Sequence, residues 1–267
     1  MMDSIFTRLD KFDLADVPKN RPNIFDFELD MQGEKVGGVL NKERIEPFDT
    51  DYYIYIKQFN CPVCERSFEA KLIKESKLRV LSVEPDLHPI CQPIDPNYYD
   101  VIICHKCGYT AAKGFFSNIA GRQADMILAD ITPKFVAPDY PDQLDVDMAI
   151  ERYELALLNS LVKNGRDGEK AYYCMKLMWF YRIKGDIDNQ KLFAELTLKG
   201  FSGALIKDDL PIMGLHIDTI TYLLGALYTL LGDKKSALRF LSDVVVSKTA
   251  SDRLKDRARS IKDQMKE

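Results

Sequence analysis

Two Cys-x-x-Cys pairs constrain this chain more than any other feature: Cys61-Pro-Val-Cys64 and Cys104-His-Lys-Cys107. Two residues between cysteines let the backbone turn so that both sulfur atoms face one metal ion, and a second pair completes a tetrahedral set of four thiolates. We therefore predict one structural zinc ion bound by Cys61, Cys64, Cys104 and Cys107. Four cysteines fill every position around the ion, which favours a structural role over a catalytic one.

Other kinds of site also use cysteines at this spacing. Redox-active dithiols lie at the start of a helix that follows a strand in a βαβ unit, whereas both pairs here follow predicted strands. Iron accepts the same four thiolates, so the choice of metal in the cell stays open. Cys91 and His88 lie between the pairs and could add a ligand, but such residues are more often incidental. Cys174 lies on an apolar helical stripe and is predicted to be core.

The charge of the chain argues against nonspecific coating of nucleic acid. Its 267 residues carry 37 basic and 41 acidic groups, a net charge of −4, and such coating depends on many cations neutralising phosphates. Residues 57–122, around the cysteines, are the only basic segment. We favour neutralisation of a zinc–thiolate centre, whose own charge is −2, as the reason. The alternative is a nucleic-acid surface formed by Lys57, Arg66, Lys71, Lys74, Lys77 and Arg79.

The segment around the cysteines is predicted to be β-rich and to resemble a zinc ribbon. Aromatic and β-branched runs predict strands at 52–59, 68–73, 77–83 and 98–103. Residues 84–97 contain four prolines and are predicted to be a loop. The 39 residues between the pairs exceed the roughly 15–20 of a compact ribbon. Earlier in the chain, Ile24–Asp30 suggests a short strand and Gly37-Gly38 a turn.

The second half is predicted to be helical. A helix past the second pair is expected around Phe115 to Ile127, and three prolines then mark a boundary. From Asp147 onward, helical spacing of apolar residues predicts six helices, with Gly200 closing the third and a loop from Gly203 to Gly214. A Tyr-x-x-x-Gly-Asp pattern occurs at two helix turns, at Tyr181 and Tyr228. The two copies of the pattern lie 47 residues apart. When the Gly203–Gly214 loop is subtracted, the remaining distance is close to the length of one tetratricopeptide repeat, which favours a tetratricopeptide-like array over an irregular bundle.

Aromatic residues are dense on the helices. Packing between helices is the simpler explanation. The alternative is a groove that binds a protein partner, because helical arrays bind along their concave faces. The residues assigned to that partner-binding role are Tyr172, Trp179, Tyr181 and Tyr228.

Residues 60–265 resemble a bacterial family known as domain of unknown function 2225. The resemblance is carried by Cys61-Pro-x-Cys64, Phe68, Ser76-Lys77-x-Arg79, Asp86-Leu87, Pro96-x-x-Tyr99-x-Val101, Cys104-x-x-Cys107-Gly108-Tyr109-x-Ala111, Ala149–Tyr153 and Tyr222–Gly225. It implies a zinc-ribbon-like front and a tetratricopeptide-like back, and it implies no activity. Glu65 departs from the pattern, because glycine, which tolerates a left-handed backbone, is common after a zinc knuckle.

The sequence thus predicts an α+β protein: a β-rich zinc-ribbon-like domain followed by an all-α tetratricopeptide-like helical array. The predicted parts are a partly ordered acidic segment at 1–49, the zinc domain at 50–131, a Pro-rich linker at 132–144 and the helical domain at 145–267. No signal peptide, membrane helix, phosphate loop or catalytic triad is recognised. We expect a cytoplasmic, non-enzymatic zinc-binding scaffold that binds a protein partner. A nucleic-acid-binding zinc ribbon and an enzyme with an unrecognised site are the alternatives.

Overall fold

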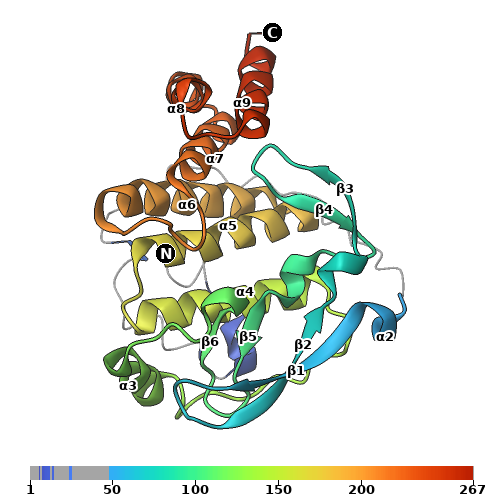
Figure 1. Cartoon of the computed structure of the whole chain (residues 1–267). Coiled ribbons are helices and arrows are strands. Elements are labelled where there is room, and N and C mark those ends of the chain that lie inside the picture. The colour runs from blue at the N-terminus through green and yellow to red at the C-terminus, as the bar shows by residue number, and fades with distance from the viewer. Residues whose placement is uncertain (1–5, 7, 13, 15–23, 26–47, 267) are drawn as a thin grey trace.

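The computed structural model of this chain describes residues 6, 8–12, 14, 24–25 and 48–266. Most of the predicted strand at Ile24–Asp30, and the turn at Gly37-Gly38, lie outside the described residues. Within them, small antiparallel sheets are followed along the chain by a long helical part (Figure 1). The predicted α+β class is confirmed at this level.

The described residues form three two-stranded antiparallel sheets. Each is a hairpin of consecutive strands: β1 (Ile54–Asn60) with β2 (Ser67–Ile73), β3 (Arg79–Val83) with β4 (Pro89–Gln92), and β5 (Val101–Ile103) with β6 (Thr110–Ala112). The first and third hairpins each have a Cys-x-x-Cys pair in the turn, so β1 and β5 deliver the cysteines as predicted. The second hairpin is inserted between them.

Several predicted segments differ from the structure. The strand predicted at 98–103 begins only at Val101, because Pro96–Tyr99 form a short 3-10 helix, and the helix expected around Phe115 to Ile127 begins at Gly121. The strand expected at 52–59 begins only at Ile54, because the side chain of Asp49 accepts a hydrogen bond from the backbone of Tyr52 and starts a short helix, α2 (Thr50–Tyr53). The loop predicted at 84–97 was wrong in part, since it contains β4. Pro89 is the first residue of that strand and Pro93 follows its last, and both are positions that a two-stranded sheet tolerates.

The helical prediction is confirmed in its number of elements beyond Asp147. Four of these six helices begin at a side chain that accepts a backbone N–H: Asp145, Asp186, Asp233 and Ser251. The helix bounds are α3 (Gly121–Asp130), α4 (Val146–Val162), α5 (Asp167–Lys184), α6 (Ile187–Lys207), α7 (Ile217–Leu230), α8 (Lys234–Val246) and α9 (Asp252–Gln264).

Gly200 does not end a helix, which corrects the sequence prediction. Helix α6 continues through it to Lys207, so residues 203–207 of the expected loop are also helical. A Cβ atom at position 200 would lie 2.5 Å from Cζ of Phe25 and 2.7 Å from Cβ of Ala171. The glycine therefore permits close packing inside a helix, a role that sequence alone does not distinguish from a stop signal.

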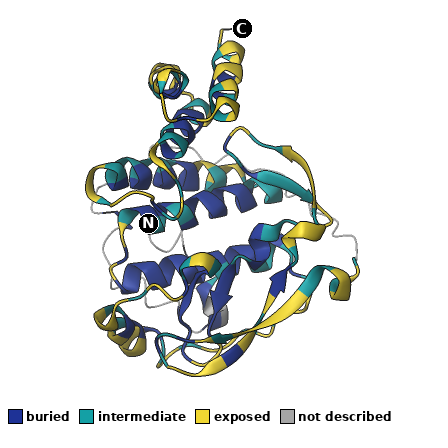
Figure 2. Cartoon of the chain, in the orientation of Figure 1, coloured by how far each residue is buried: buried dark blue, intermediate teal, exposed yellow. Residues whose placement is uncertain are grey.

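The two predicted parts share one hydrophobic core, which runs from Cys61 and Phe68 to Phe193 and Leu227. Helix α4 is buried along most of its length (Figure 2). The segment predicted as a linker, 132–144, packs against the same core through Leu144, and its Asp142 carbonyl accepts a hydrogen bond of 2.8 Å from the Tyr99 hydroxyl. The division into domains stays a prediction.

The inserted β3–β4 hairpin extends toward the later helices (Figure 1). Its tip is held by hydrogen bonds from α7 and α9: the Tyr222 hydroxyl donates to the Pro85 carbonyl at 2.7 Å, and Arg257 donates to the Val83 carbonyl at 3.3 Å. Arg182 of α5 forms an ion pair with Asp86 in the same turn. The hairpin therefore joins the cysteine-bearing region to three helices.

Among the described helices, none combines the length and the apolar character needed to cross a bilayer.

Candidate metal centre

The two cysteine pairs form turns with the same backbone hydrogen bonds. In the first, Glu65 N–H donates to the Cys61 carbonyl and Cys61 N–H donates to the Arg66 carbonyl, at 2.9 and 3.0 Å. In the second, Gly108 and Cys104 make the equivalent bonds, the latter to the Tyr109 carbonyl, both at 2.9 Å. We call these turns, residues 61–66 and 104–109, the first and second knuckle. Because the two turns share these backbone hydrogen bonds, each presents its two sulfur atoms in the same geometry.

The position after each cysteine pair is left-handed. Gly108 has φ 78° and Glu65 has φ 57°, so the first knuckle forms with glutamate where glycine was expected. Glu65 is exposed and has room for its side chain. Gly108 has none, because a Cβ there would lie 2.6 Å from Cγ of Phe135 and 2.9 Å from Cγ2 of Ile131.

The four sulfur atoms converge, as predicted. All lie within 4.8 Å of one another. Across the two knuckles, Sγ of Cys61 is 3.6 Å from Sγ of Cys107, and Sγ of Cys64 is 3.7 Å from Sγ of Cys104. A disulfide would need about 2.05 Å, whereas a tetrahedral ion with metal–sulfur bonds of about 2.3 Å separates its ligands by about 3.8 Å. The spacing therefore fits a shared metal ion.

The electrostatics of the metal-free cluster are those of crowded thiols sharing protons. Hydrogen bonds from the Cys107 and Cys61 thiols stabilise the Cys104 thiolate and lower the pKa of Cys104 to about 2. The hydrogen bond to Cys104 raises the pKa of Cys61 to about 12, and the pKa of Cys107 is raised for the same reason. Cys61, Cys104 and Cys107 are buried and Cys64 is half-buried. A cation entering the cluster must displace protons held in this way.

Helix α4 supports the second knuckle through a buried amide that sequence reasoning missed. Asn159 is fully buried, its Nδ2 donates to the Gly108 carbonyl at 3.1 Å, and its Oδ1 accepts from Thr110 N–H at 3.2 Å. Thr132 adds a hydrogen bond of 2.9 Å to the Cys107 carbonyl. The sequence signal is a pair of polar residues, Asn159 and Ser160, inside the otherwise apolar run Leu155–Val162.

The other cysteines and histidines considered lie outside this cluster. Cys91 lies in β4 and Cys174 is buried in α5, in the core as predicted. His105 is exposed on the second knuckle. His88 is buried, stacks on Trp179 with ring centroids 4.6 Å apart, and contacts Asp95 at 2.6 Å and Arg182 at 3.0 Å. His88 therefore belongs to the network that fastens the β3–β4 hairpin to α5.

The aromatic residues assigned to a partner groove differ in accessibility. Trp179 and Tyr181 are 3% and 2% exposed, and Tyr181 stacks on Phe193. Tyr172 and Tyr228 are half-buried, and Tyr228 stacks on Phe240. A partner that docks on the chain as folded would reach only Tyr172 and Tyr228 of the four. A partner-binding role for the set stays a prediction.

The basic residues assigned to nucleic acid lie on the first hairpin and just after it. All are exposed except Lys74, which is half-buried. Lys71 forms an ion pair with Asp142, and Lys77 lies over the ring of Tyr52. The exposed carboxylates Glu65, Glu69 and Glu75 are interleaved with them in sequence. Nucleic-acid binding by Lys57, Arg66, Lys71, Lys74, Lys77 and Arg79 stays a prediction.

Comparison with known proteins places the chain in a family. The family described as an uncharacterized protein conserved in bacteria (DUF2225) matches residues 54–265, which include both knuckles and all six later helices. This chain belongs to that family. A search of curated proteins and a search of solved structures each found no match.

Proposed function

We propose that this member of the family is a non-enzymatic scaffold in which one structural zinc ion holds a zinc-ribbon-like region beside a tetratricopeptide-like helical array that binds a protein partner. The observation that carries the proposal is the convergence of four cysteine sulfurs from two matching knuckles, within 4.8 Å. Four thiolates complete the coordination of zinc, so the ion would supply folding free energy rather than an open catalytic position.

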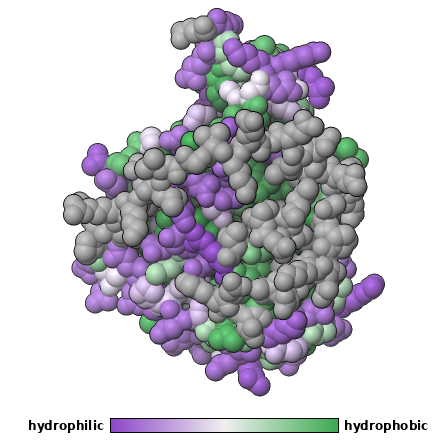
Figure 3. All heavy atoms as spheres, turned by 180° about the vertical axis from the view of Figure 1, so that it is seen from behind, coloured by the Kyte–Doolittle hydropathy of each residue, from purple (hydrophilic) through white to green (hydrophobic). Residues whose placement is uncertain are grey.

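The helices support the second half of the proposal. Helices α5 and α6, and α7 and α8, follow one another through short turns, as in paired-helix repeats. Leu241 of α8 lies so close to α7 that a Cβ at Gly225 would be 2.7 Å from its Cγ. Leu238 and Val246 of α8 are 39% and 76% exposed, and Figure 3 shows apolar areas among the hydrophilic surface at this end. We propose α8 as part of the docking face.

Metal analysis tests the zinc site. Purified protein should contain about one zinc per chain. Cys104→Ser should lose it, whereas Cys91→Ser, which changes a cysteine outside the cluster, should retain it. Chelation should also speed amide hydrogen exchange across residues 54–112, because structural zinc contributes on the order of 10 kcal/mol to folding. Wild-type protein without zinc or iron, prepared in metal-replete medium, would refute the proposal.

Affinity capture tests the scaffold. We expect a specific protein to be retained by wild type and by Lys248→Asp, a charge change beyond the end of α8, and to be lost from the double variant Leu238→Asp and Val246→Asp. Partners lost only from Cys104→Ser would map to the zinc region instead. If no protein distinguishes these variants, the docking role is wrong. Retention of wild type on a nucleic-acid column, falling steeply with salt, would favour the nucleic-acid alternative.

A further inference from the structure

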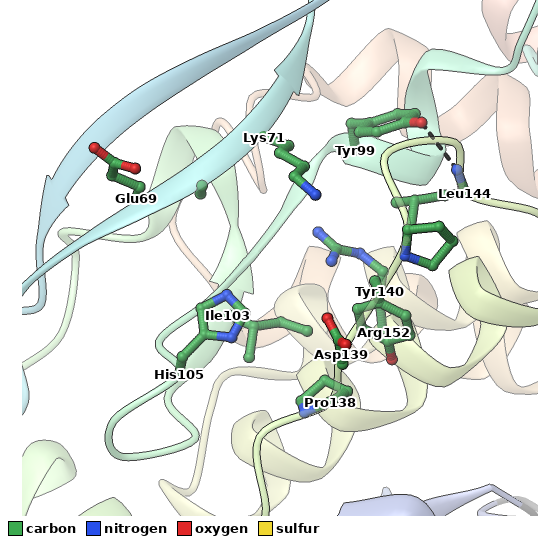
Figure 4. Close-up of a pocket in the computed structure, with 12 residues that line it drawn as sticks. Glu69, Lys71, Tyr99, Ile103, His105, Pro138, Asp139, Tyr140, Leu144 and Arg152 are labelled. Atoms are coloured by element: carbon green, nitrogen blue, oxygen red, sulfur yellow. Dashed lines mark hydrogen bonds between the residues drawn. The ribbon is translucent and has the colours of Figure 1, made fainter. Parts of the chain in front are cut away.

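A pocket of about 220 Å³ lies between the second knuckle, the first hairpin and helix α4. Figure 4 shows side chains that reach it from these separate elements: Lys71 from β2, His105 from the second knuckle, Tyr140 from the segment before α4, and Arg152 from α4. Because its walls come from both halves of the chain, the pocket exists only when the cysteine-bearing region is packed on the helices.

Arg152 is the unusual residue in this pocket. Its Nε is buried and has no hydrogen-bond partner within the described part of the chain. Nη2 donates to the Val101 carbonyl, and the guanidinium lies over the Tyr140 ring, 5.6 Å from its centroid. No described carboxylate forms an ion pair with it. Burial lowers the pKa of Arg152, in keeping with a guanidinium that has no carboxylate partner among the described residues.

The other charged residues on the pocket wall are of both signs. Figure 4 shows the ammonium of Lys71 and the guanidinium of Arg152 turned toward the same space. Lys71 has a partner, Asp142, but both side chains of that ion pair are more than a third exposed, and such pairs contribute little. Glu69 and Asp139 also line the pocket, and neither forms an ion pair with Arg152. Two cations therefore line one cavity, and one of them, Arg152, has no ion-pair partner among the described residues.

The rest of the lining sets the kind of ligand. Tyr99, Tyr140, Pro138 and Pro141 form apolar walls. The Tyr99 hydroxyl is already used, because it donates to the Asp142 carbonyl and accepts from Leu144 N–H. At roughly 30 Å³ per water molecule, the volume corresponds to about seven waters. A ligand of this size with one oxyanion and one small apolar group would satisfy both the cations and the walls.

We propose that this pocket binds a small organic oxyanion, a carboxylate or a phosphate monoester, with the guanidinium of Arg152 as its anchor and Lys71 at its rim. The planar guanidinium group of arginine matches two oxygens of such a group. An oxyanion would supply the counter-charge that no described carboxylate gives to Arg152 through an ion pair.

Isothermal titration calorimetry of the full-length, metal-loaded protein tests the proposal. The probes are benzoate, phenyl phosphate and inorganic phosphate. We expect one site per chain for benzoate or for phenyl phosphate, and the probe that binds identifies the oxyanion. Arg152→Met and Arg152→Lys should weaken binding about tenfold or more, because they remove a charged, two-pronged hydrogen bond. Arg122→Met, which removes an exposed arginine of α3, should leave the affinity unchanged.

Lys71→Met provides a second variant at an exposed position, where folding is not at stake. It should weaken binding severalfold. The proposal is wrong if none of the three probes produces binding heat at millimolar concentration. It is also wrong if binding is equally strong in wild type, Arg152→Lys and Lys71→Met, because the anion would then lie elsewhere on the chain.

Discussion

Gly108→Ala should destabilise the protein strongly, because two independent physical constraints exclude a side chain there. The backbone at this position has φ 78°, and an L-residue in the left-handed region costs about 1–2 kcal/mol. The new Cβ would also lie 2.6 Å from Cγ and 2.8 Å from Cδ2 of Phe135. These are ring atoms, not the end of a flexible chain, so the ring must move, and overpacking of this kind costs about 1–3 kcal/mol.

The combined expectation is a loss of about 2–5 kcal/mol in the free energy of unfolding. Urea denaturation of the metal-loaded protein, followed by circular dichroism, would measure it as a lower midpoint at unchanged slope. Glu65→Ala is the matched control, because it introduces the same residue at the equivalent position of the first knuckle. Glu65 already holds a left-handed backbone with an exposed side chain, so this change should stay within about 0.5 kcal/mol.

Two results would refute the reasoning. A loss below about 1 kcal/mol for Gly108→Ala would mean that Phe135 does not pack against the second knuckle as described. An equal loss for Glu65→Ala would mean that the glutamate side chain itself stabilises its turn.

Three further predictions follow from buried groups. Asn159→Leu should cost about 1–3 kcal/mol in thermal unfolding, because Thr110 N–H and the Gly108 carbonyl lose their partner; an unchanged midpoint would contradict the role of this amide. Burial lowers the pKa of Lys176 to about 8 from 10.5. Between these two pH values, Lys176 is therefore mostly protonated in the unfolded chain and mostly neutral in the folded protein. The free energy of unfolding should then rise by about 3 kcal/mol from pH 8 to 10.5, a rise absent from Lys176→Met in parallel urea titrations. Zinc affinity, measured against a competing chelator, should fall by at least about tenfold per pH unit below neutrality, because the raised pKa of Cys61 and Cys107 means that binding displaces protons; a pH-independent affinity would exclude these thiols as ligands.

Features that depend on local spacing could be predicted from the sequence. Two residues between cysteines determine a knuckle, and the four sulfurs do converge. Apolar periodicity located the six later helices, because each buries apolar residues at helical spacing, down to Ala258 and Ile261 of α9. Strand Ser67–Ile73 was placed to within one residue of the predicted 68–73. In each of these, the residues that determine the structure lie close together in the chain.

Features that depend on distant contacts could not be predicted. Arg182 meets Asp86 across 96 positions and Arg152 meets Val101 across 51, and no local pattern marks either pair. Gly200 has the composition of a helix stop, and only the contacts with Phe25 and Ala171 show that it is a packing position. Strand β4 was missed because prolines signal loops, although the two prolines beside it fall where pairing does not need their N–H.

The unusual distance between the cysteine pairs has a mechanical consequence. An ion bound at both knuckles would clamp the two ends of the stretch from Cys64 to Cys104, while the middle of that stretch is tied to Tyr222 and Arg257. This stretch of chain therefore connects the sulfur cluster directly with the later helices. Releasing the ion would loosen this stretch at the knuckles, and the change would reach α7 and α9 both along the stretch and through the core residues it contributes, such as Phe68 and Tyr99.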